Sequence, residues 1–348
     1  MAVLPTLQTA MIGSMPQLNA DDALALLEKY PLSIPTWPQL PKTSFKEAMI
    51  PQYCEGFPGI KIDENEKKIW VEKDNELINS IATFFEKIIE NNYDAFAISK
   101  EYAKGFHSFF EMYKDKGNKL PFAKGQITGP FTFGLGLSDN EKKSVWYDEQ
   151  YKEVVINGLK FKALWQYNKL KEISEKVIIF MDEPILSALG TSAYLSIQDN
   201  DVINVINEIA DALRQEGIIV GIHCCGNTDW GLITKCNIDI LAFDAYFYGD
   251  RVSLYGNELK TFLEKGNMLA FGIIPTSDAN KLNNESKDNL VQKISLLINN
   301  LEKKGIDKDL IKNQMVFTPS CGFGSGSLSI EESELVLKLL NELKGCEI

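Results

Sequence analysis

The chain has 348 residues and a formal net charge of −12; 45% of its residues are hydrophobic and 24% are charged. This composition is typical of a globular protein with a sizeable core, and no apolar run approaches the ~20 residues that a membrane-spanning helix needs. An acidic surface repels nucleic-acid phosphates and anionic membranes, so we expect neither as a partner.

The N-terminal part of the chain is less regular than the rest. Residues 1–10 have no basic start followed by an apolar stretch, so they do not resemble a signal peptide, and the cytoplasm is the expected compartment. Asn19 is a candidate N-cap, because its side chain can accept hydrogen bonds from the first amides of a helix. Residues 31–62 are rich in proline and are expected to form a loop-rich excursion. Strands are predicted at Thr9–Ile12 and Phe122–Ile127, and helices at Asp21–Lys29, Leu77–Asn91 and Tyr151–Lys171.

The C-terminal half repeats a simple unit: a short apolar strand, a turn rich in Gly, Pro, Ser or Asp, and an amphipathic helix. The strands of this half are predicted at Val177–Met181, Ile218–Ile222, Asp239–Phe243, Met268–Ile273 and Met315–Phe317. The helices are predicted at Val202–Arg214, Glu258–Lys265, Lys287–Lys304 and Ile330–Leu343.

Alternation of strands and helices predicts an α/β fold with a parallel sheet. About eight such units in a chain of this length favour one closed (β/α)8 barrel of the TIM type, with residues 1–348 as a single domain and the excursion covering one barrel face. In such barrels the chemistry lies where the strands end. The residues directly after each strand are therefore the candidates for function.

A histidine and two cysteines follow predicted strands. His223 and Cys225 come directly after the strand at 218–222. Side chains at i and i+2 of an extended segment point the same way, so both can face one ion while Cys224 points away. Cys321 follows the strand at 315–317. Two thiolates and one imidazole suit zinc, and three ligands with an open fourth position are the pattern of a catalytic site.

The cysteines by themselves do not establish a metal. The chain has six cysteines, and without a signal peptide they favour metal or catalytic use over disulfides. Buried cysteines are nevertheless often inert core residues, and this is the interpretation for Cys54, Cys236 and Cys346. An isolated His-x-Cys pair is a weak signal, which Cys321 strengthens.

Acidic residues also follow two strands. Asp182 and Glu183 follow the strand at 177–181 and precede Pro184. Paired carboxylates there suit binding an amine or orienting a reacting group, although a helix N-cap with an acid in the first turn gives the same pattern. Asp244 follows the strand at 239–243 and is expected to complete the metal shell or to pair with substrate.

Two further strand ends offer hydroxyl groups and backbone amides. Ser14 and Thr128 are candidate substrate-binding residues, and turn chemistry explains each of them equally well. The segment 324–327 lacks the Lys-Ser/Thr ending of a nucleoside-triphosphate loop, so at most weak anion binding at the start of the last helix is expected.

Together these motifs resemble the catalytic domain of cobalamin-independent methionine synthase, within the wider group of uroporphyrinogen decarboxylase-like corrinoid methyltransferases. The likeness runs from about residue 9 to residue 345 and so spans nearly the whole chain. The motifs occur in the family's order, all at predicted strand ends: Met11–Gln17, Thr128–Pro130, Asp182–Pro184, His223-x-Cys225 and Pro319–Gly322.

The resemblance implies a barrel and a thiol substrate bound to zinc. It implies the histidine and two cysteines named above as metal ligands, with Asp244 in the place of a family glutamate that also binds the metal. Ser14 and Asp182 correspond to residues that hold the amino-acid end of homocysteine. The candidate catalytic residues are therefore Asp182, Glu183 and Asp244, and the candidate substrate-binding residues are Ser14, Asp182 and Thr128.

Departures from the family bear on the methyl donor. The family's full-length enzymes carry an N-terminal second barrel that helps bind folate, which this sequence lacks, and the usual basic residues after the last cysteine are replaced by 323–327. Both departures favour a methylcorrinoid over methyltetrahydrofolate polyglutamate as the methyl donor. The DxHxxG pattern of a corrinoid-binding module is absent, so the corrinoid is expected on a partner protein or as free methylcobalamin.

The expected reaction is methyl transfer to a thiol whose pKa zinc lowers, so that the thiolate attacks the methyl group in line. Homocysteine or a similar small thiol is the favoured methyl acceptor, because no cationic clamp for a sulfonate such as coenzyme M is identifiable. Three alternatives stay open: a metal-free methylcorrinoid–folate methyltransferase, a tetrapyrrole decarboxylase on the same barrel, and a non-enzymatic zinc-binding or corrinoid-protein-binding module. The decarboxylase would need arginines near the first strand, and residues 9–16 contain none.

Overall fold

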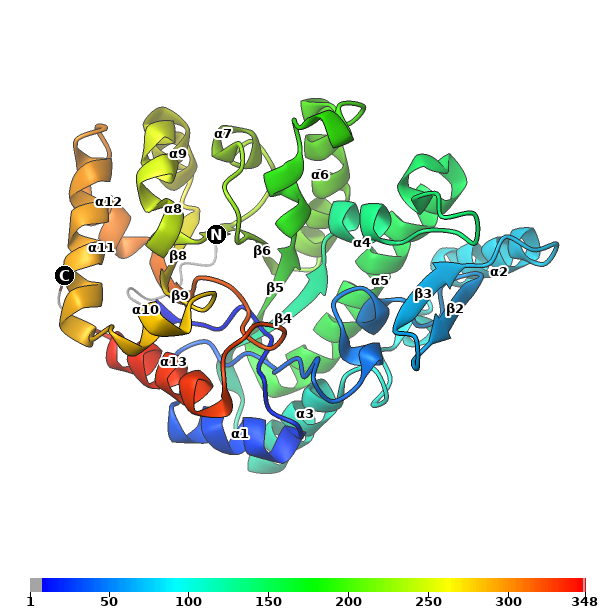
Figure 1. Ribbon diagram of the computed structural model, residues 1–348, viewed down its shortest axis with the longest axis horizontal. Helices are drawn as coiled ribbons and strands as arrows, with labels where there is room; N and C mark the ends of the chain where they lie inside the picture. Colours follow the sequence, from blue (N-terminus) through cyan, green and yellow to red (C-terminus); the bar gives the residue numbers. More distant parts are fainter. Residues whose placement is uncertain (1–7, 347) are drawn as a thin grey trace.

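The computed structural model describes residues 8–346 and 348, so most of the segment on which the signal-peptide expectation rests lies outside it. The described chain has the α/β architecture that the sequence predicts, with helices around one curled parallel sheet (Figure 1). The sheet has seven strands in the order β1-β9-β8-β7-β6-β5-β4. Their bounds are β1 Gln8–Thr9, β4 Leu120–Thr128, β5 Ser174–Asp182, β6 Ile219–Cys224, β7 Ile240–Phe243, β8 Met268–Ile274 and β9 Met315–Pro319.

The predicted closed eight-stranded barrel is wrong in its closure. The regular sheet is open between its edge strands β1 and β4. Residues 34–39, expected to belong to the excursion, lie between these edges and form no regular strand. Pro35 and Pro38 lack the amide hydrogen that a strand ladder needs, which explains the irregularity. The segment instead makes isolated parallel bridges: Ala10 with Ile34, Ser14 with Gln39, and Thr36 with Lys124.

Apolar side chains cover both faces of the sheet. The larger cluster lies between the strands and the helices, and a smaller one, which includes Ile34 and Phe180, fills the concave interior. Burial on both faces explains why the sequences of strands such as β8 are continuous apolar runs. Gly221 makes room for the interior cluster, because a Cβ at this position would lie 2.2 Å from the ring of Phe180.

The predicted helices are all present. Asn19 caps the first of them as expected, accepting from Asp22 N at 2.8 Å. The shorter helices escaped prediction because they span too few turns to show a period, whereas the helix Lys104–Lys116 was missed although it has 13 residues. No helix among residues 8–346 is long and apolar enough to cross a membrane. The helices are α1 Ala20–Lys29, α2 Leu77–Ile89, α3 Lys104–Lys116, α4 Pro130–Gly136, α5 Glu149–Ile173, α6 Asp199–Gln215, α7 Trp230–Ile233, α8 Ala245–Val252, α9 Gly256–Glu264, α10 Ala279–Asn283, α11 Lys287–Glu302, α12 Lys308–Asn313 and α13 Ile330–Glu342.

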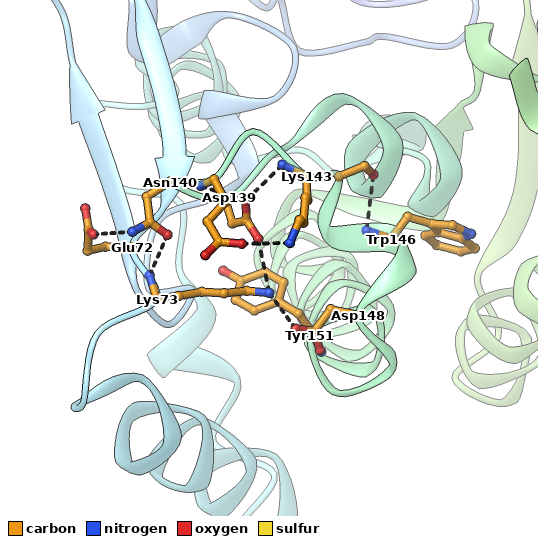
Figure 2. A network of polar contacts seen from close by, with 10 residues as sticks. Glu72, Lys73, Asp139, Asn140, Lys143, Trp146, Asp148 and Tyr151 are labelled. Atoms are coloured by element: carbon orange, nitrogen blue, oxygen red, sulfur yellow. Dashed lines mark hydrogen bonds and ion pairs between the residues drawn. The ribbon is translucent and has the colours of Figure 1, made fainter.

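The rest of the excursion projects to one side of the sheet. An antiparallel hairpin of β2 (Ile60–Asp63) and β3 (Lys68–Val71) lies with α2 at the right-hand edge of Figure 1. Figure 2 shows its anchor, in which Lys73 Nζ contacts Asp139 Oδ2 at 3.1 Å and Asp148 Oδ2 at 2.9 Å. Burial raises the pKa of Asp139, but hydrogen bonds from Lys143 N and Lys73 outweigh it and hold that pKa below its usual value. The anchor therefore ties the hairpin to the segment before α5.

Helix α3 packs directly against the segment that lies between the sheet edges. A Cβ on Gly105 would lie 1.9 Å from the carbonyl oxygen of Pro38, and backbone cannot move aside as a flexible side chain can. We expect Gly105→Ala to lower the free energy of unfolding by about 1–3 kcal/mol through overpacking. Helix propensity alone predicts the opposite sign, a gain of about 1 kcal/mol.

Urea titration followed by circular dichroism measures this change. Glu111→Ala, at an exposed position of the same helix, is the control and should stay within about 0.5 kcal/mol of the wild type. Equal or greater stability of Gly105→Ala would show that residues 34–39 are not held against α3.

Candidate functional site

A cavity of about 210 Å³ lies at the carboxyl ends of the strands. This is the end at which parallel barrels carry their chemistry, and several residues singled out in the sequence converge on it. Its walls come from the strand ends and from the excursion. The lining residues are Ile12, Ser14, Gln39, Pro41, Glu47, Met49, Thr128, Asp182, Pro184, His223, Cys225, Cys321, Gly322 and Ser325.

The structure brings the three predicted metal ligands together. Among the described residues His223, Cys225 and Cys321 form a group whose ligand atoms all lie within 4.8 Å of one another. The alternation along β6 has the expected consequence, because His223 and Cys225 line the cavity while Cys224 is buried in the helix-side core. The ends of β6 and β9, which β7 and β8 separate in the sheet, thus deliver a compact set of one imidazole and two thiols.

The chemistry of this group suits a metal ion. His223 is 2% exposed, yet neither of its ring nitrogens has a hydrogen-bond partner in the described chain, which leaves a lone pair free to bind. A hydrogen bond from Cys321 and the adjacent His223 lower the pKa of Cys225 to about 4, against the effect of burial. The hydrogen bond to Cys225 and burial raise the pKa of Cys321 well above its usual value. One thiolate, one thiol and an unpartnered imidazole are a donor set that fits zinc.

Asp182 lies beside this group on the cavity wall. Its side chain ends β5, and its Oδ1 is buried without a hydrogen-bond partner in the described chain. Burial raises the pKa of Asp182 to about 6, and electrostatic interactions with Lys124 and His223 work in the opposite direction. An unpartnered carboxylate on a cavity wall is free to accept a hydrogen bond from a bound ligand.

Glu183 has a different position from its neighbour. It is 0% exposed and does not line the cavity. Its carboxylate accepts from Phe131 N and Thr132 N, each at 2.8 Å, and from Thr132 Oγ1 at 2.6 Å. Burial nevertheless raises the pKa of Glu183 to about 7. Its catalytic role stays a prediction, and these contacts favour a structural role at the N-terminus of α4.

Asp244 lies close to the ligand group without joining it. It is the N-cap of α8, where its Oδ1 accepts from Phe247 N at 2.9 Å. Burial raises the pKa of Asp244 to about 7, and His223 and Cys225 both act on it electrostatically. The described structure therefore leaves the fourth metal position without an assigned protein ligand, and Asp244 as that ligand stays a prediction.

Ser14 and Thr128 line the cavity but already hold protein groups. Ser14 Oγ accepts from Gly324 N at 3.1 Å, which fixes the loop after β9. That loop needs glycine, since a Cβ on Gly322 would lie 2.3 Å from Ser14 Oγ. Thr128 Oγ1 donates to the carbonyl of Met49 at 2.6 Å and so tethers the excursion over the cavity. The Ser14 hydroxyl can therefore still donate to a ligand, whereas the Thr128 hydroxyl already donates to Met49 O.

Sequence reasoning missed the wall that the excursion supplies. Gln39 lines the cavity, and its amide nitrogen donates to Gln52 Oε1 at 2.6 Å and to Tyr53 OH at 3.1 Å. Glu47 accepts from Leu40 N and Thr43 Oγ1, so its carboxylate holds the loop rather than facing a free space. No short motif marks these residues. The available signal was the cluster of prolines, which indicates a constrained rather than a mobile segment.

The glycine-rich loop before α13 does not favour an anion. The N-terminus of α13 is closed by a capping box between Ser329 and Glu332. Glu331 and Glu332 also place negative charge in the first turn. The weak anion site expected at 324–327 is therefore disfavoured, although Ser325 does line the cavity.

No family model and no curated protein matches the chain. Among solved structures it is similar to a Listeria monocytogenes protein described as a "putative vitamin-B12 independent methionine synthase", with a TM-score of 0.55 and 12% identity over 98% of this chain and 99% of that one. It also aligns with dispersin B over 99% of this chain and 100% of that one, at a TM-score of 0.44 and 12% identity, too low to support an argument. Identities this low show the fold alone.

The orientation along β6 generates a test of the metal site. We expect Cys224→Ser to retain bound zinc, because Cys224 faces the helix-side core, whereas Cys225→Ser should lose most of it. Zinc per chain, measured by elemental mass spectrometry after gel filtration, distinguishes the two variants. An equal loss in both would contradict the assignment of Cys225 as a ligand.

Proposed function

We propose that this chain is an enzyme that transfers a methyl group to a small thiol activated by zinc. One observation carries the proposal: an imidazole and two thiols from separate strand ends gather within 4.8 Å on the wall of a cavity. A structural zinc site has four closed ligands, whereas three ligands beside a cavity leave a position for a substrate. The fold-level likeness to the Listeria protein supports the same class of chemistry.

The proposed zinc ion would lower the pKa of an acceptor thiol so that its thiolate is available at neutral pH. The chain's own residues would position the rest of the acceptor. Asp182 is suited to an ammonium group, because its carboxylate lines the cavity without a partner on Oδ1. The Ser14 hydroxyl is suited to a carboxylate. Homocysteine or a similar amino thiol fits this pair of contacts.

The charge of the cavity also bears on rival substrates. No lysine or arginine is among the residues described as lining it. A sulfonate such as coenzyme M or the several carboxylates of a tetrapyrrole would need such cations. The lining therefore favours an amino thiol over these two substrate classes.

In the proposed reaction the acceptor thiol gives up its proton to water and its sulfur attacks the methyl carbon in line. The new S–C bond forms as the bond between the methyl group and its donor breaks, and the electron pair of that bond leaves with the donor. The proposed donor is a methylcorrinoid on a partner protein or free methylcobalamin. A methylfolate is the second choice, because the described lining includes no lysine or arginine for a polyglutamate tail. Holding both reactants at one site supplies much of the acceleration.

Metal content is the first test. Protein purified without chelator should contain about one zinc per chain, and Cys321→Ser should lose it because one of three ligands is gone. Cys236→Ser, a buried cysteine outside the group, is the control and should keep its zinc. Folded, unoxidised wild type without zinc would refute zinc activation and leave the metal-free methyltransferase.

Methyl transfer is tested separately with zinc-loaded protein. Loss of methylcobalamin absorbance together with S-methylated product from homocysteine is the expected result. Stoichiometric zinc without transfer from methylcobalamin, a methylcorrinoid protein or methyltetrahydrofolate would instead support a binding module.

A further inference from the structure

Lys124 is a buried cation in the concave interior of the sheet. It is 1% exposed, and its Nζ lies 4.4 Å from the centroid of the Phe180 ring. The ammonium donates to Ile12 O at 2.6 Å and to Gln126 Oε1 at 3.2 Å. Among the described residues no carboxylate oxygen lies within ion-pair distance of it, although carboxylates are the usual partners of a buried ammonium group.

The contacts of Lys124 place its charge beneath the candidate acceptor site. Thr128 pairs with Asp182 in the register of β4 and β5, and Gln126 pairs with Phe180 one interior layer below. Because Lys124 Nζ reaches Gln126 Oε1 and Phe180, the ammonium lies at the layer beneath Asp182. The two charged groups act on each other electrostatically without forming an ion pair.

The same ammonium also fixes the turn after β1. Its acceptor Ile12 O belongs to a residue that lines the cavity, two positions before Ser14. Lys124 thus contacts one half of the proposed amino-acid site and acts through space on the other half. A methionine of similar volume would fill the interior without the cost of desolvating a charge, so packing alone does not account for a lysine here.

We propose that Lys124 is a positioning residue of the acceptor site: its ammonium group holds the Ile12–Ser14 turn, so that the Ser14 hydroxyl faces the carboxylate of the acceptor. Because Lys124 forms no ion pair with Asp182, Asp182 Oδ1 remains free for the ammonium group of the acceptor. The inference rests on the proposed function, since it specifies an amino thiol as the acceptor.

The chain offers a matched control. Lys162 is 0% exposed, and its Nζ donates to Ala97 O at 3.0 Å, but it does not line or contact the cavity residues. Burial lowers the pKa of each of these two lysines to about 8, so both are charged groups in similarly dry surroundings. Lys162→Met therefore reproduces the general cost of replacing a buried lysine.

Binding selectivity is the measurement. Isothermal titration calorimetry of the zinc-loaded protein compares homocysteine with 3-aminopropane-1-thiol, which has the same thiol-to-amine skeleton and lacks only the carboxylate. We expect Lys124→Met to weaken homocysteine binding roughly tenfold and 3-aminopropane-1-thiol binding less than about twofold, because only homocysteine carries the carboxylate that the Ser14 turn positions. Lys162→Met should change neither dissociation constant. In turnover assays the Lys124 variant should raise KM more than it lowers kcat.

A conservative variant covers the case in which Lys124→Met does not fold. Lys124→Gln keeps a shorter donor for Ile12 O, so it should show the same selective loss of homocysteine in a weaker form, roughly threefold. Unchanged homocysteine binding, or equal weakening of both ligands, would overturn the assignment of Lys124 while leaving the proposed function in place. Wild type that binds neither ligand would overturn both.

Discussion

The curl of the sheet is the constraint on which the candidate site depends. Strands β6 and β9 are separated by β7 and β8, so in a flat sheet with strands about 4.8 Å apart their ends would lie roughly 14 Å from each other. The ligand atoms at those ends nevertheless lie within 4.8 Å. Curling brings the carboxyl ends inward, and small residues permit it: the interior positions of β7 and β8 include Ala242 and Ala270. Gly272 lets β8 and β9 approach closely where their register is irregular, since a Cβ on Gly272 would lie 2.8 Å from Ser320 Cα.

The segment that lies at the opening of the sheet also forms a wall of the site. Prolines keep residues 34–39 from completing a ladder, yet the segment lies against both edges and continues directly into the cavity lining at Gln39 and Pro41. Thr128 then holds the next stretch of the excursion through Met49 O. The irregular segment therefore contributes polar groups where a regular eighth strand would present only alternate side chains to the interior.

Local patterns in the sequence predicted the sheet strands and the common direction of His223 and Cys225, because both depend on short-range periodicity. Cys321 joined the group because parallel strands end at the same edge of a sheet. His223 and Cys225 were assigned one direction from the two-residue alternation of a strand, and the structure agrees. The excursion wall and the capping contact of Glu183 on α4 were not predictable in this way. They depend on contacts such as Thr128 with Met49 and Glu183 with Phe131, which join residues 79 and 52 positions apart. Asp182 and Glu183 show the difficulty most clearly: adjacent in sequence and identical in charge, they face a cavity and a helix terminus respectively.

The balance of charge around the cavity explains why a divalent cation suits it better than an anionic ligand. The described lining carries the carboxylates of Glu47 and Asp182 and two thiols, with no lysine or arginine. Glu47 is held by loop donors, so its charge is partly satisfied by the protein. Among the described residues Asp182 and the thiols have no comparable set of donors, and the ammonium of Lys124 lies below them. An anionic substrate would add to this imbalance, whereas a dication and a substrate ammonium group would each relieve it.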